Sequence, residues 1–439
     1  MKYFKFLTVL FLLIVPVFLS ACDKIPFLNQ GASDQPVELT YWGLWESEPV
    51  IQSLIAAYQA NNPNVTVSYQ RQTPQQYRER LEARIAAGEG PDIFRFHNTW
   101  VPMLKEELAT LPSSVMDEST FTSTFNTVAV NDLKTENGLV GIPLEYDGLG
   151  LYYNEDIFKS AGIVKVPTTW EEVRQTASKI TVRDANGAIQ TAGVALGSST
   201  NIDHFSDILA LMMMQNSVNL SKPTDARVGL TSQLATDALD FYLIFAKDSQ
   251  TRVWDETLPA STLAFASGKL GMYFAPSWRA FEIKQANPSL KFKIAPVPQL
   301  PPNPPLSFAS YWVEGVSSQS PDQEEAWKFI AFLSEPDNLR TLYAEASKTR
   351  LFGEPYSRRD LSSSVAADQF VGGILSDASN AKSWYLSSNT FDNGINDQMI
   401  EVFKTAVTDA AKNNDSKRAL STASSKANEI LSKFGSTSR

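Results

Sequence analysis

The sequence predicts an α/β protein in which helices cover sheets of parallel type. In residues 37–96, strand-like and helix-like patterns alternate in the order strand, helix, strand, helix, strand. The alternation continues beyond them without an internal repeat. Of the 439 residues, 43% are hydrophobic, which is enough for a large buried core. Alternating strands and helices are typical of parallel sheets with helices on their faces.

The first elements follow from the spacing of apolar residues. VELTYW (37–42), VTVSY (65–69) and DIFRF (92–96) have the pattern of strands. Two intervening helices each present one apolar face, formed by Ile51, Leu54, Ile55 and Tyr58 in the first and by Tyr77, Leu81 and Ile85 in the second. Because ligands of parallel sheets bind beyond the carboxyl ends of the strands, the loops that follow these strands are candidate sites.

The later elements are assigned in the same way. We expect strands over 149–154, 270–274, 292–295 and 313–317, and mostly helix over 398–434. Further helix faces are predicted from Trp170, Val173, Ala177 and Ile180, from Leu234, Ala238, Phe241 and Phe245, and from Trp327, Ile330 and Leu333. The proline-rich stretch PVPQLPPNPPL (296–306) fits either a crossing between domains or a protruding loop.

The N-terminus has the pattern of an export signal. Lys2 and Lys5 precede an apolar run, Phe6–Leu19, of about 14 residues, whereas a helix needs roughly 20 to span a bilayer. The run leads to Leu-Ser-Ala-Cys, which ends at Cys22, the only cysteine. This motif resembles the bacterial lipobox, which implies cleavage after residue 21 and lipid on Cys22. The alternative is an ordinary cleaved signal with a chance cysteine. Residues 22–36 read as a flexible, lipidated tether.

Charge and composition exclude several functions. Removing residues 1–21 takes away Lys2 and Lys5 and no acids, so the formal charge changes from −10 to −12. This acidic balance argues against a nucleic-acid partner. No G-x-S-x-G, complete P-loop or H-E-x-x-H motif is present, so neither a catalytic centre nor a cofactor or metal site is expected. Asp184-Ala-Asn-Gly187 resembles the start of a calcium loop, but a plain turn is the preferred interpretation.

Several segments resemble the extracellular solute-binding proteins of ABC importers, in the group of maltodextrin and multiple-sugar binders. The most specific is VGIPLEYDGLGLYYNEDIFKSAGIVKVPTTWEEV (140–173). The others, in the order expected for the family, are VELTYWGLWE, GEGPDIFRFHNTWVPMLKEELATLP, FASGKLGMYFAPSW and EEAWKFIAFLSEPDNLRTLY. The likeness covers roughly residues 37–345 and is weaker over the C-terminal helices.

The resemblance implies a two-lobed periplasmic-binding-protein fold of type II, with several chain segments crossing a hinge. One lobe would comprise 37–143 plus 296–345, and the other 144–295 plus 346–439. It also implies a monomer that binds a carbohydrate between the lobes, performs no chemistry and delivers the ligand to the permease subunits. With lipid on Cys22, the protein would be held at the extracytoplasmic face of the bacterial cell membrane.

Candidate ligand residues are aromatic and polar side chains near strand ends. Sugars are bound by flat apolar rings together with polar groups at the ring edge. Asp147 and Trp278 match family positions for a sugar-binding acid and a stacking tryptophan, and the rest follow from position: Trp45, Glu46, Asn98, Trp100, Tyr146, Tyr311 and Trp312. His97 is expected to be a satisfied polar residue, whereas Trp170 and Trp327 are expected in the core.

Some alternatives remain open from the sequence. Trp42, Trp254 and Trp384 fit either the core or a cleft wall, and Arg279 fits either an anion site or a pair with Glu282. A surface glycoside hydrolase is a rival function, because Glu46, Asp147 and Glu314 could serve as its carboxylates. Binding of a non-sugar solute, such as a phosphodiester or a polyamine, is a second rival.

Overall fold

The computed structural model describes residues 35–220, 229–247 and 251–434. The described residues from Val37 onward belong to one compact unit, which is the subject of the following description. The predicted signal peptide (1–21), Cys22 and the tether up to residue 34 lie outside the described residues. Within the described part, no helix is long and apolar enough to cross a membrane.

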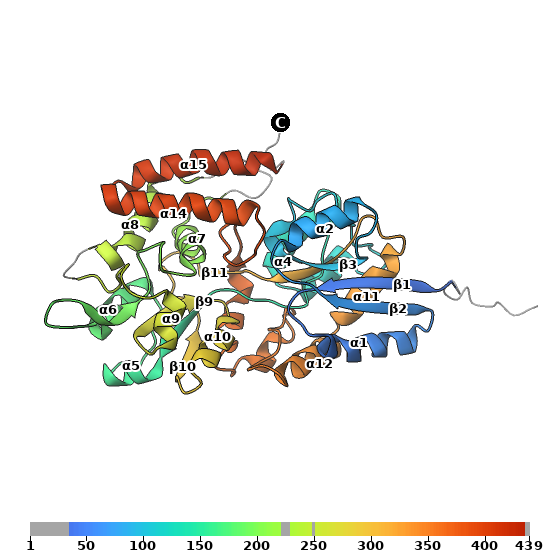
Figure 1. Cartoon of the computed structure of the whole chain (residues 1–439), viewed down its shortest axis with the longest axis horizontal. Helices are drawn as coiled ribbons and strands as arrows, with labels where there is room; N and C mark the ends of the chain where they lie inside the picture. Colours follow the sequence, from blue (N-terminus) through green and yellow to red (C-terminus); the bar gives the residue numbers. More distant parts are fainter. Residues whose placement is uncertain (1–34, 221–228, 248–250, 435–439) are drawn as a thin grey trace, which may run out of the picture. The chain divides into compact units, whose positions relative to one another are not determined.

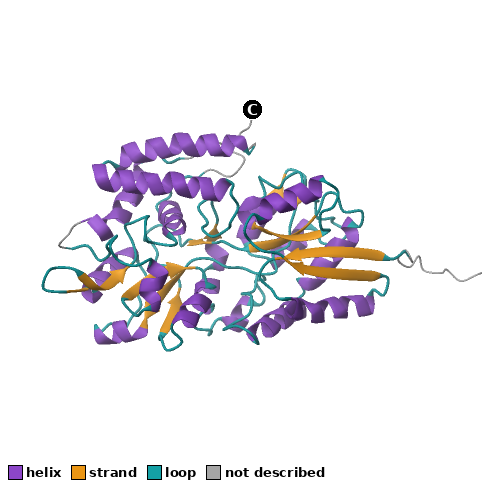
Figure 2. Cartoon of the chain, viewed as in Figure 1, coloured by secondary structure: helices purple, strands orange, loops and turns teal. Residues whose placement is uncertain are grey.

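The first sheet has four strands in the order β12-β3-β1-β2 (Figures 1 and 2). β1 (Val37–Gly43) pairs in parallel with both β2 (Val65–Arg71) and β3 (Ile93–His97). β12 (Trp312–Val316) joins the edge at β3 in the antiparallel direction. The carboxyl ends of β1 and β3 and the start of β12 therefore lie at one edge, with Trp312 opposite His97.

Helices cover both faces of this sheet, as the apolar spacing predicts. The expected inner faces of α1 (Glu48–Asn61) and α2 (Tyr77–Ala86) are buried. α1 contacts α11 (Gln323–Leu333) and α12 (Pro336–Ser347), whereas Figure 1 shows α2 across the sheet from α1. Trp327 on α11 is fully buried, so its assignment to the core is confirmed.

The second sheet has five strands in the order β10-β6-β9-β8-β7. They are β6 (Gly150–Asn154), β7 (Val182–Arg183), β8 (Ile189–Val194), β9 (Leu270–Ala275) and β10 (Phe292–Ala295). The α/β class is confirmed, but only β8 and β9 pair in parallel here; the other three pairs are antiparallel. The sheet is therefore mixed, because β6 and β10 pair directly across a long insertion rather than through one short helical crossover.

The helices around the second sheet comprise α5 (Glu155–Ser160), α6 (Trp170–Ile180), α7 (Phe205–Gln215), α8 (Gln233–Lys247), α9 (Ser261–Ala266), α10 (Arg279–Ala286), α14 (Ile395–Asn413) and α15 (Ser416–Lys433). α6 begins at Thr169, whose side chain accepts a hydrogen bond from the Glu172 N–H, and its predicted apolar face is buried. α14 and α15 lie side by side and contact α8 (Figure 1). The mostly helical C-terminus is therefore confirmed.

The face predicted for α8 is partly wrong. Ala238 and Phe245 are buried, but Leu234 is 42% exposed and Phe241 is only half-buried. Tyr242 and Leu239 take their place in the core. α8 packs against α7 on one side and against α14 and α15 on another, so its buried face is broader than one apolar stripe.

Shorter elements join these layers. They are α3 (Glu118–Thr124), α4 (Thr127–Leu133), α13 (Gly372–Ser376), the hairpin β4 (Lys134–Thr135) and β5 (Gly138–Leu139), the pair β11 (Ser307–Phe308) and β13 (Ala381–Lys382), and the 3-10 turns η1 (Asn98–Trp100), η2 (Ser362–Val365) and η3 (Ala378–Asn380). Residues 184–187 form a turn, as expected: the Asp184 carboxylate accepts the N–H groups of Asn186 and Ala188, and Gly187 has a φ of +84°.

Three chain segments meet between the two sheets. Residues 142–148 form bridges to 309–314 through Ile142–Glu314 and Gly148–Ala309, and to Tyr356 through Glu145. Hydrogen bonds run from the Tyr146 N–H to the Pro355 carbonyl (2.8 Å) and from the Ser310 N–H to the Asp147 carbonyl (3.0 Å). The segments that carry Tyr146, Asp147 and Tyr311 are therefore fixed against one another by backbone contacts.

The core around α2 gives a direct test of the fold. Leu81 is fully buried, so Leu81→Ala should lower the free energy of unfolding by about 2–5 kcal/mol, the range for leucine truncation in a core. Leu263→Ala is the matched control, because Leu263 is 59% exposed and its loss should cost less than about 0.5 kcal/mol. Urea unfolding measures both. Equal effects of the two substitutions would contradict the burial of α2.

Candidate functional site

Three of the predicted tryptophans form one aromatic cluster at the carboxyl edge of the first sheet. The Trp312 ring meets Trp45 at 5.6 Å and Trp100 at 5.3 Å between centroids, each edge to face. His97 lies 5.2 Å from the same ring. Trp45 is 37% exposed and Trp312 is half-buried, whereas Trp100 is fully buried. Trp45 and Trp312 therefore keep part of their ring surface exposed, and the buried Trp100 packs against Trp312.

His97 supports this cluster and has the expected role of a satisfied polar residue. Its ring nitrogens lie 2.8 Å from the Thr99 hydroxyl and 3.1 Å from the Ser310 hydroxyl. Burial lowers the pKa of His97 to about 3, so the ring is neutral at physiological pH.

Asn98 and Tyr311 are joined through a carboxylate that sequence reasoning missed. The Asn98 side-chain amide and the Tyr311 hydroxyl each donate to Oδ2 of Asp132, both at 2.9 Å. The Tyr311 N–H in turn donates to Asn98 Oδ1 at 3.2 Å. Tyr146 stacks on Tyr311 with centroids 6.1 Å apart. The three predicted residues Asn98, Tyr146 and Tyr311 are buried and lie together, and the side-chain polar atoms of Asn98 and Tyr311 are occupied by Asp132 and, at Asn98 Oδ1, by the Tyr311 N–H.

Glu46 is anchored to a buried arginine. Arg95, in the middle of β3, forms ion pairs of 2.6 Å with both Glu46 and Glu314. Its side chain is 1% exposed, and Tyr41 donates a further hydrogen bond to Glu314 at 3.0 Å. Burial raises the pKa of Glu46 to about 7, although the Arg95 guanidinium opposes this effect. Glu46 thus has a structural anchor within the predicted site.

Asp147 and Trp278 lie together on the side of the second sheet. The Asp147 carboxylate accepts hydrogen bonds from the N–H groups of Gly148 (2.7 Å) and Ser277 (3.0 Å) and from the Ser277 hydroxyl (2.8 Å). Burial raises the pKa of Asp147 to about 7, although these hydrogen bonds favour the ionised form. Ser277, which directly precedes Trp278, is a second residue that the sequence did not single out.

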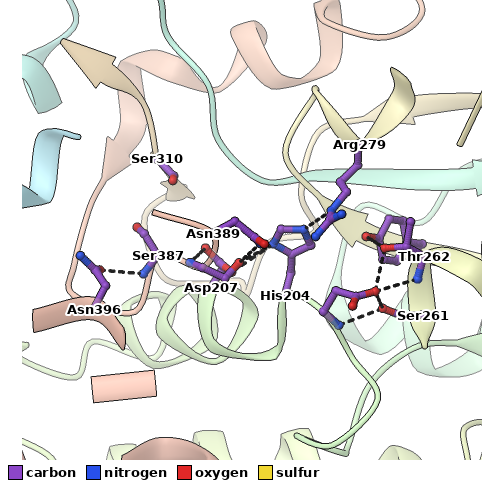
Figure 3. A network of polar contacts seen from close by, with 12 residues as sticks. His204, Asp207, Ser261, Thr262, Arg279, Ser310, Ser387, Asn389 and Asn396 are labelled. Carbon is purple, nitrogen blue, oxygen red and sulfur yellow. Dashed lines mark hydrogen bonds and ion pairs between the residues drawn. The ribbon is translucent and has the colours of Figure 1, made fainter. Parts of the chain in front are cut away.

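Trp278 lies edge to face with His204, at 5.9 Å between ring centroids, and His204 belongs to a polar network (Figure 3). The Arg279 guanidinium lies 4.3 Å from the Trp278 ring centroid, and its Nε donates to His204 Nε2 at 2.9 Å. On its other side, His204 Nδ1 contacts the Ser388 hydroxyl (2.7 Å) and Asp207 (3.2 Å). Arg279 also pairs with Glu282, which was one of the two sequence alternatives. The guanidinium is therefore engaged within the protein.

Two further tryptophans prove to be core residues. Trp254 is fully buried and donates from Nε1 to Asn201 at 2.9 Å, and Trp384 is 4% exposed. Trp170, which was expected in the core, is 3% exposed. From the sequence, Trp254 and Trp384 fitted either the core or a cleft wall; their burial assigns both to the core.

Two surface cavities lie away from these residues. One of about 500 Å³ is lined by Trp42, Gln70, Gln72, Arg80, Ala83, Arg84 and Glu89, at the edge where β2 meets α2. Another of about 330 Å³ borders β6 and α5. None of the nine predicted ligand residues lines either cavity. In the described part of the chain, no group of three or more His, Cys, Asp or Glu side chains is placed to hold a metal ion.

Residues 45–339 match the family of bacterial extracellular solute-binding proteins, and the chain belongs to this family. A Brucella abortus binding protein is 25% identical over 66% of this chain and 69% of its own length. The multiple sugar-binding protein of Streptococcus mutans is 22% identical, and the match covers 78% of this chain and 81% of the Streptococcus protein. Among solved structures, the cyclic α-maltosyl-1,6-maltose binding protein of Arthrobacter globiformis has a TM-score of 0.73 at 19% identity. The superposition covers 91% of this chain and 100% of the Arthrobacter protein.

Arg95 should be essential to the local structure. Arg95→Met leaves Glu46 and Glu314 buried without their shared guanidinium, so the free energy of unfolding should fall by about 3–5 kcal/mol. Arg84→Met is the matched control, because the Arg84–Glu89 pair is exposed and should contribute less than about 1 kcal/mol. Chemical unfolding at neutral pH compares the two. A loss at Arg95 as small as that at Arg84 would contradict the ion-pair geometry.

Proposed function

We propose that this protein binds a carbohydrate, most simply an oligosaccharide, in a cleft between two lobes and delivers it to the permease of an ABC importer. The observation that carries the proposal is the aromatic cluster of Trp45, Trp100 and Trp312, bordered by Asn98, Glu46 and Tyr311. Ring faces bordered by hydrogen-bonding groups suit the apolar and hydroxyl surfaces of a sugar. The names of the Streptococcus and Arthrobacter proteins support the same ligand class.

The proposed lobes are 37–143 plus 296–345 and 144–295 plus 346–439. This division is supported by the sheets, because β1, β2, β3 and β12 fall in the first lobe and β6 to β10 in the second. The segments at 142–148, 309–314 and 356 that pair between the sheets are the proposed hinge. Such a hinge needs only a few backbone angles to change when the lobes close. Tyr146 and Asp147 lie on it, so closure would bring them to the ligand together with Trp278.

Binding without hydrolysis is the proposed activity. A glycoside hydrolase needs two carboxyl groups that can reach the sugar from either side of the bond to be cleaved. Glu46 and Glu314 are instead joined to one guanidinium, and Glu314 is fully buried. The remaining candidate, Asp147, accepts three hydrogen bonds from Gly148 and Ser277. This arrangement favours binding, as does membership of a family of binding proteins.

A thermal-shift screen against short gluco- and manno-oligosaccharides tests the ligand class. A sugar present at 100 times its dissociation constant should add about 2.7 kcal/mol of stability. Chromatography of the same mixtures should recover the sugar intact. No shift with any carbohydrate, together with a shift from a phosphodiester or a polyamine, would contradict the proposal, and shortened sugar chains would indicate the hydrolase.

Trp278→Ala should weaken binding of the best sugar about tenfold, because a stacked ring contributes roughly 0.5–1.5 kcal/mol beyond its buried area. Folding should change little, since Trp278 is only half-buried. Trp42→Ala is the matched control, as Trp42 borders the separate cavity beside α2. Fluorescence titration measures both affinities. Unchanged affinity in Trp278→Ala would remove that residue from the site.

The location proposed for the protein is the outer face of the cell membrane, attached through lipid on Cys22 as a monomer. The support is the Leu-Ser-Ala-Cys motif after the apolar run, together with the extracellular family. Cys22→Ser should release the protein from the membrane fraction, because two or three acyl chains are needed for stable attachment. Membrane fractionation followed by mass spectrometry of the N-terminus checks this. A Cys22→Ser protein that still sediments with membranes would contradict the anchor.

A further inference from the structure

Behind the Trp45–Trp312 pair lies a cluster of buried charged residues with an excess of acid. Its members are Glu46, Glu145, Glu314, Glu354, Arg95 and Arg350. The four glutamates are at most 9% exposed, and Arg95 is 1% exposed. Full ionisation would place four negative charges against two positive ones in a region with little water. Because an unpaired buried charge is costly, the cluster favours binding protons over keeping all four carboxyls ionised.

The ion pairs show which carboxyls carry the excess. Arg95 joins Glu46 and Glu314, and Arg350 joins Glu354. Among the described residues, no ion pair joins Glu145 to a cation; instead, Glu145 Oε1 accepts a hydrogen bond from the backbone N–H of Trp312 at 3.1 Å. Glu46 uses Oε2 for Arg95, and its buried Oε1 has no N–H or hydroxyl donor. Glu46 Oε1 and the second carboxyl oxygen of Glu145 are therefore available to hold a proton.

Glu354 is the partner that such a proton would face. It lies two residues before Tyr356, which pairs with Glu145 in a backbone bridge, and its charge acts on both Glu145 and Glu46. Two carboxyl groups can share a hydrogen bond only when one of them carries a proton. Burial and the proximity of Glu354 raise the pKa of Glu145 well above its ordinary value, and burial raises that of Glu46 to about 7. Although burial opposes ionisation, the Arg350 guanidinium, together with the neighbouring Glu145 and Glu46 carboxyls, holds the pKa of Glu354 below its usual range. The other charged or titratable groups that act on these carboxyls are Arg95, Arg350, Asp147, Glu314, Tyr41 and Tyr69.

We propose that Glu46, Glu145 and Glu354 form a proton-sharing carboxyl cluster that positions Trp45 and Trp312 for the ligand. Glu145 and Glu354 are then positioning residues of the binding site, and the role in ligand binding rests on the proposed function. The cluster connects three parts of the site. Glu46 directly follows Trp45, and Glu145 holds the first residue of β12 and precedes Tyr146. Glu354 precedes Pro355, whose carbonyl accepts the Tyr146 N–H.

The proposal predicts how stability depends on pH. The folded state binds a proton at Glu46 or Glu145 more tightly than the unfolded chain, in which a glutamate has its ordinary pKa of 4.5. Stability from these groups is therefore complete below about pH 4.5 and is lost as the pH rises through about 7. Loss of the shared proton leaves neighbouring carboxylates to repel one another, which loosens the loop after β1 and the start of β12.

Glu145→Gln separates this proposal from an ordinary buried ion pair. The glutamine keeps an oxygen for the Trp312 N–H and gives Glu354 a permanent N–H donor, so it mimics the protonated acid. At about pH 8 it should be at least as stable as the unmodified protein, with a weaker decline between about pH 4.5 and 8. Glu314→Gln is the matched control: it removes one of the two carboxylates paired with Arg95, so the protein should be destabilised at every pH in this range. A Glu145→Gln protein destabilised at pH 8 as much as Glu314→Gln would overturn the proposal.

Infrared spectroscopy supplies a measurement that needs no variant. The folded, unmodified protein near neutral pH should show the carbonyl band of a protonated carboxyl, and the band should disappear on unfolding at the same pH. Absence of that band in the folded protein would overturn the shared proton.

A binding experiment tests the positioning role and uses the carbohydrate that gives the largest thermal shift. Its affinity should fall about tenfold as the pH rises from about 6 to 8 and stay nearly constant in Glu145→Gln. Glu145→Ala should bind weakly at all pH values. Unmodified affinity that does not fall with pH, or a Glu145→Gln protein as weak as Glu145→Ala, would overturn the positioning role. If no carbohydrate binds, the proposed function fails, whereas the stability and infrared results still decide the shared proton.

Discussion

The buried guanidinium of Arg95 is the interaction on which the carboxyl edge of the first sheet depends. A charged side chain 1% exposed needs anionic partners, and Arg95 finds them on the loop after β1 and on β12. Those partners, Glu46 and Glu314, lie far from it in sequence, so the pairs fix elements that local propensity could not bring together. Trp45, Trp100 and Trp312 emerge from the elements fixed in this way. The ion pairs of Arg95 with Glu46 and Glu314 thus fix the position of the three tryptophan rings.

The same constraint explains why acids are so frequent near the proposed hinge. Glu145 and Glu354 lie on two of the segments that meet between the sheets, where backbone pairing of Glu145 with Tyr356 brings them close. Carboxyls held together in this way must share protons or separate. If these segments act as the proposed hinge, the protonation of Glu145 and Glu354 would be coupled to ligand binding, because both carboxyls lie on the segments that cross between the sheets. Asp147 belongs to a different environment, because backbone and hydroxyl donors from Ser277 and Gly148 surround it.

Much of the fold could be predicted where a pattern is local. The inner faces of α1, α2 and α6 followed from apolar spacing, and strand ends correctly placed Trp45, Asn98 and Trp312 near one edge of the first sheet. The α8 face was less accurate, because that helix contacts three others and apolar spacing cannot reveal how wide the buried surface is. The antiparallel pairs of the second sheet were also missed, since strand direction there depends on segments distant in sequence.

Most of the residues that were missed at the candidate site have partners that are remote in the sequence. Asp132 meets Tyr311 across 179 positions, and nothing near it in sequence marks it as a hydrogen-bond partner of that residue. Glu145 stood beside Tyr146, and its place next to a predicted hinge residue was the one signal that could have found it. Glu354 had no such signal, because acids in loops are usually solvated.

Hydrogen–deuterium exchange with and without the best carbohydrate tests the central claim most directly, namely that this aromatic surface and the hinge bind the ligand. Exchange should become slower in peptides from both proposed lobes, namely those that cover 45–46, 97–100, 145–147, 277–278 and 311–312. Protection confined to 70–84, beside the cavity that contains Trp42, or to one sheet alone would contradict it.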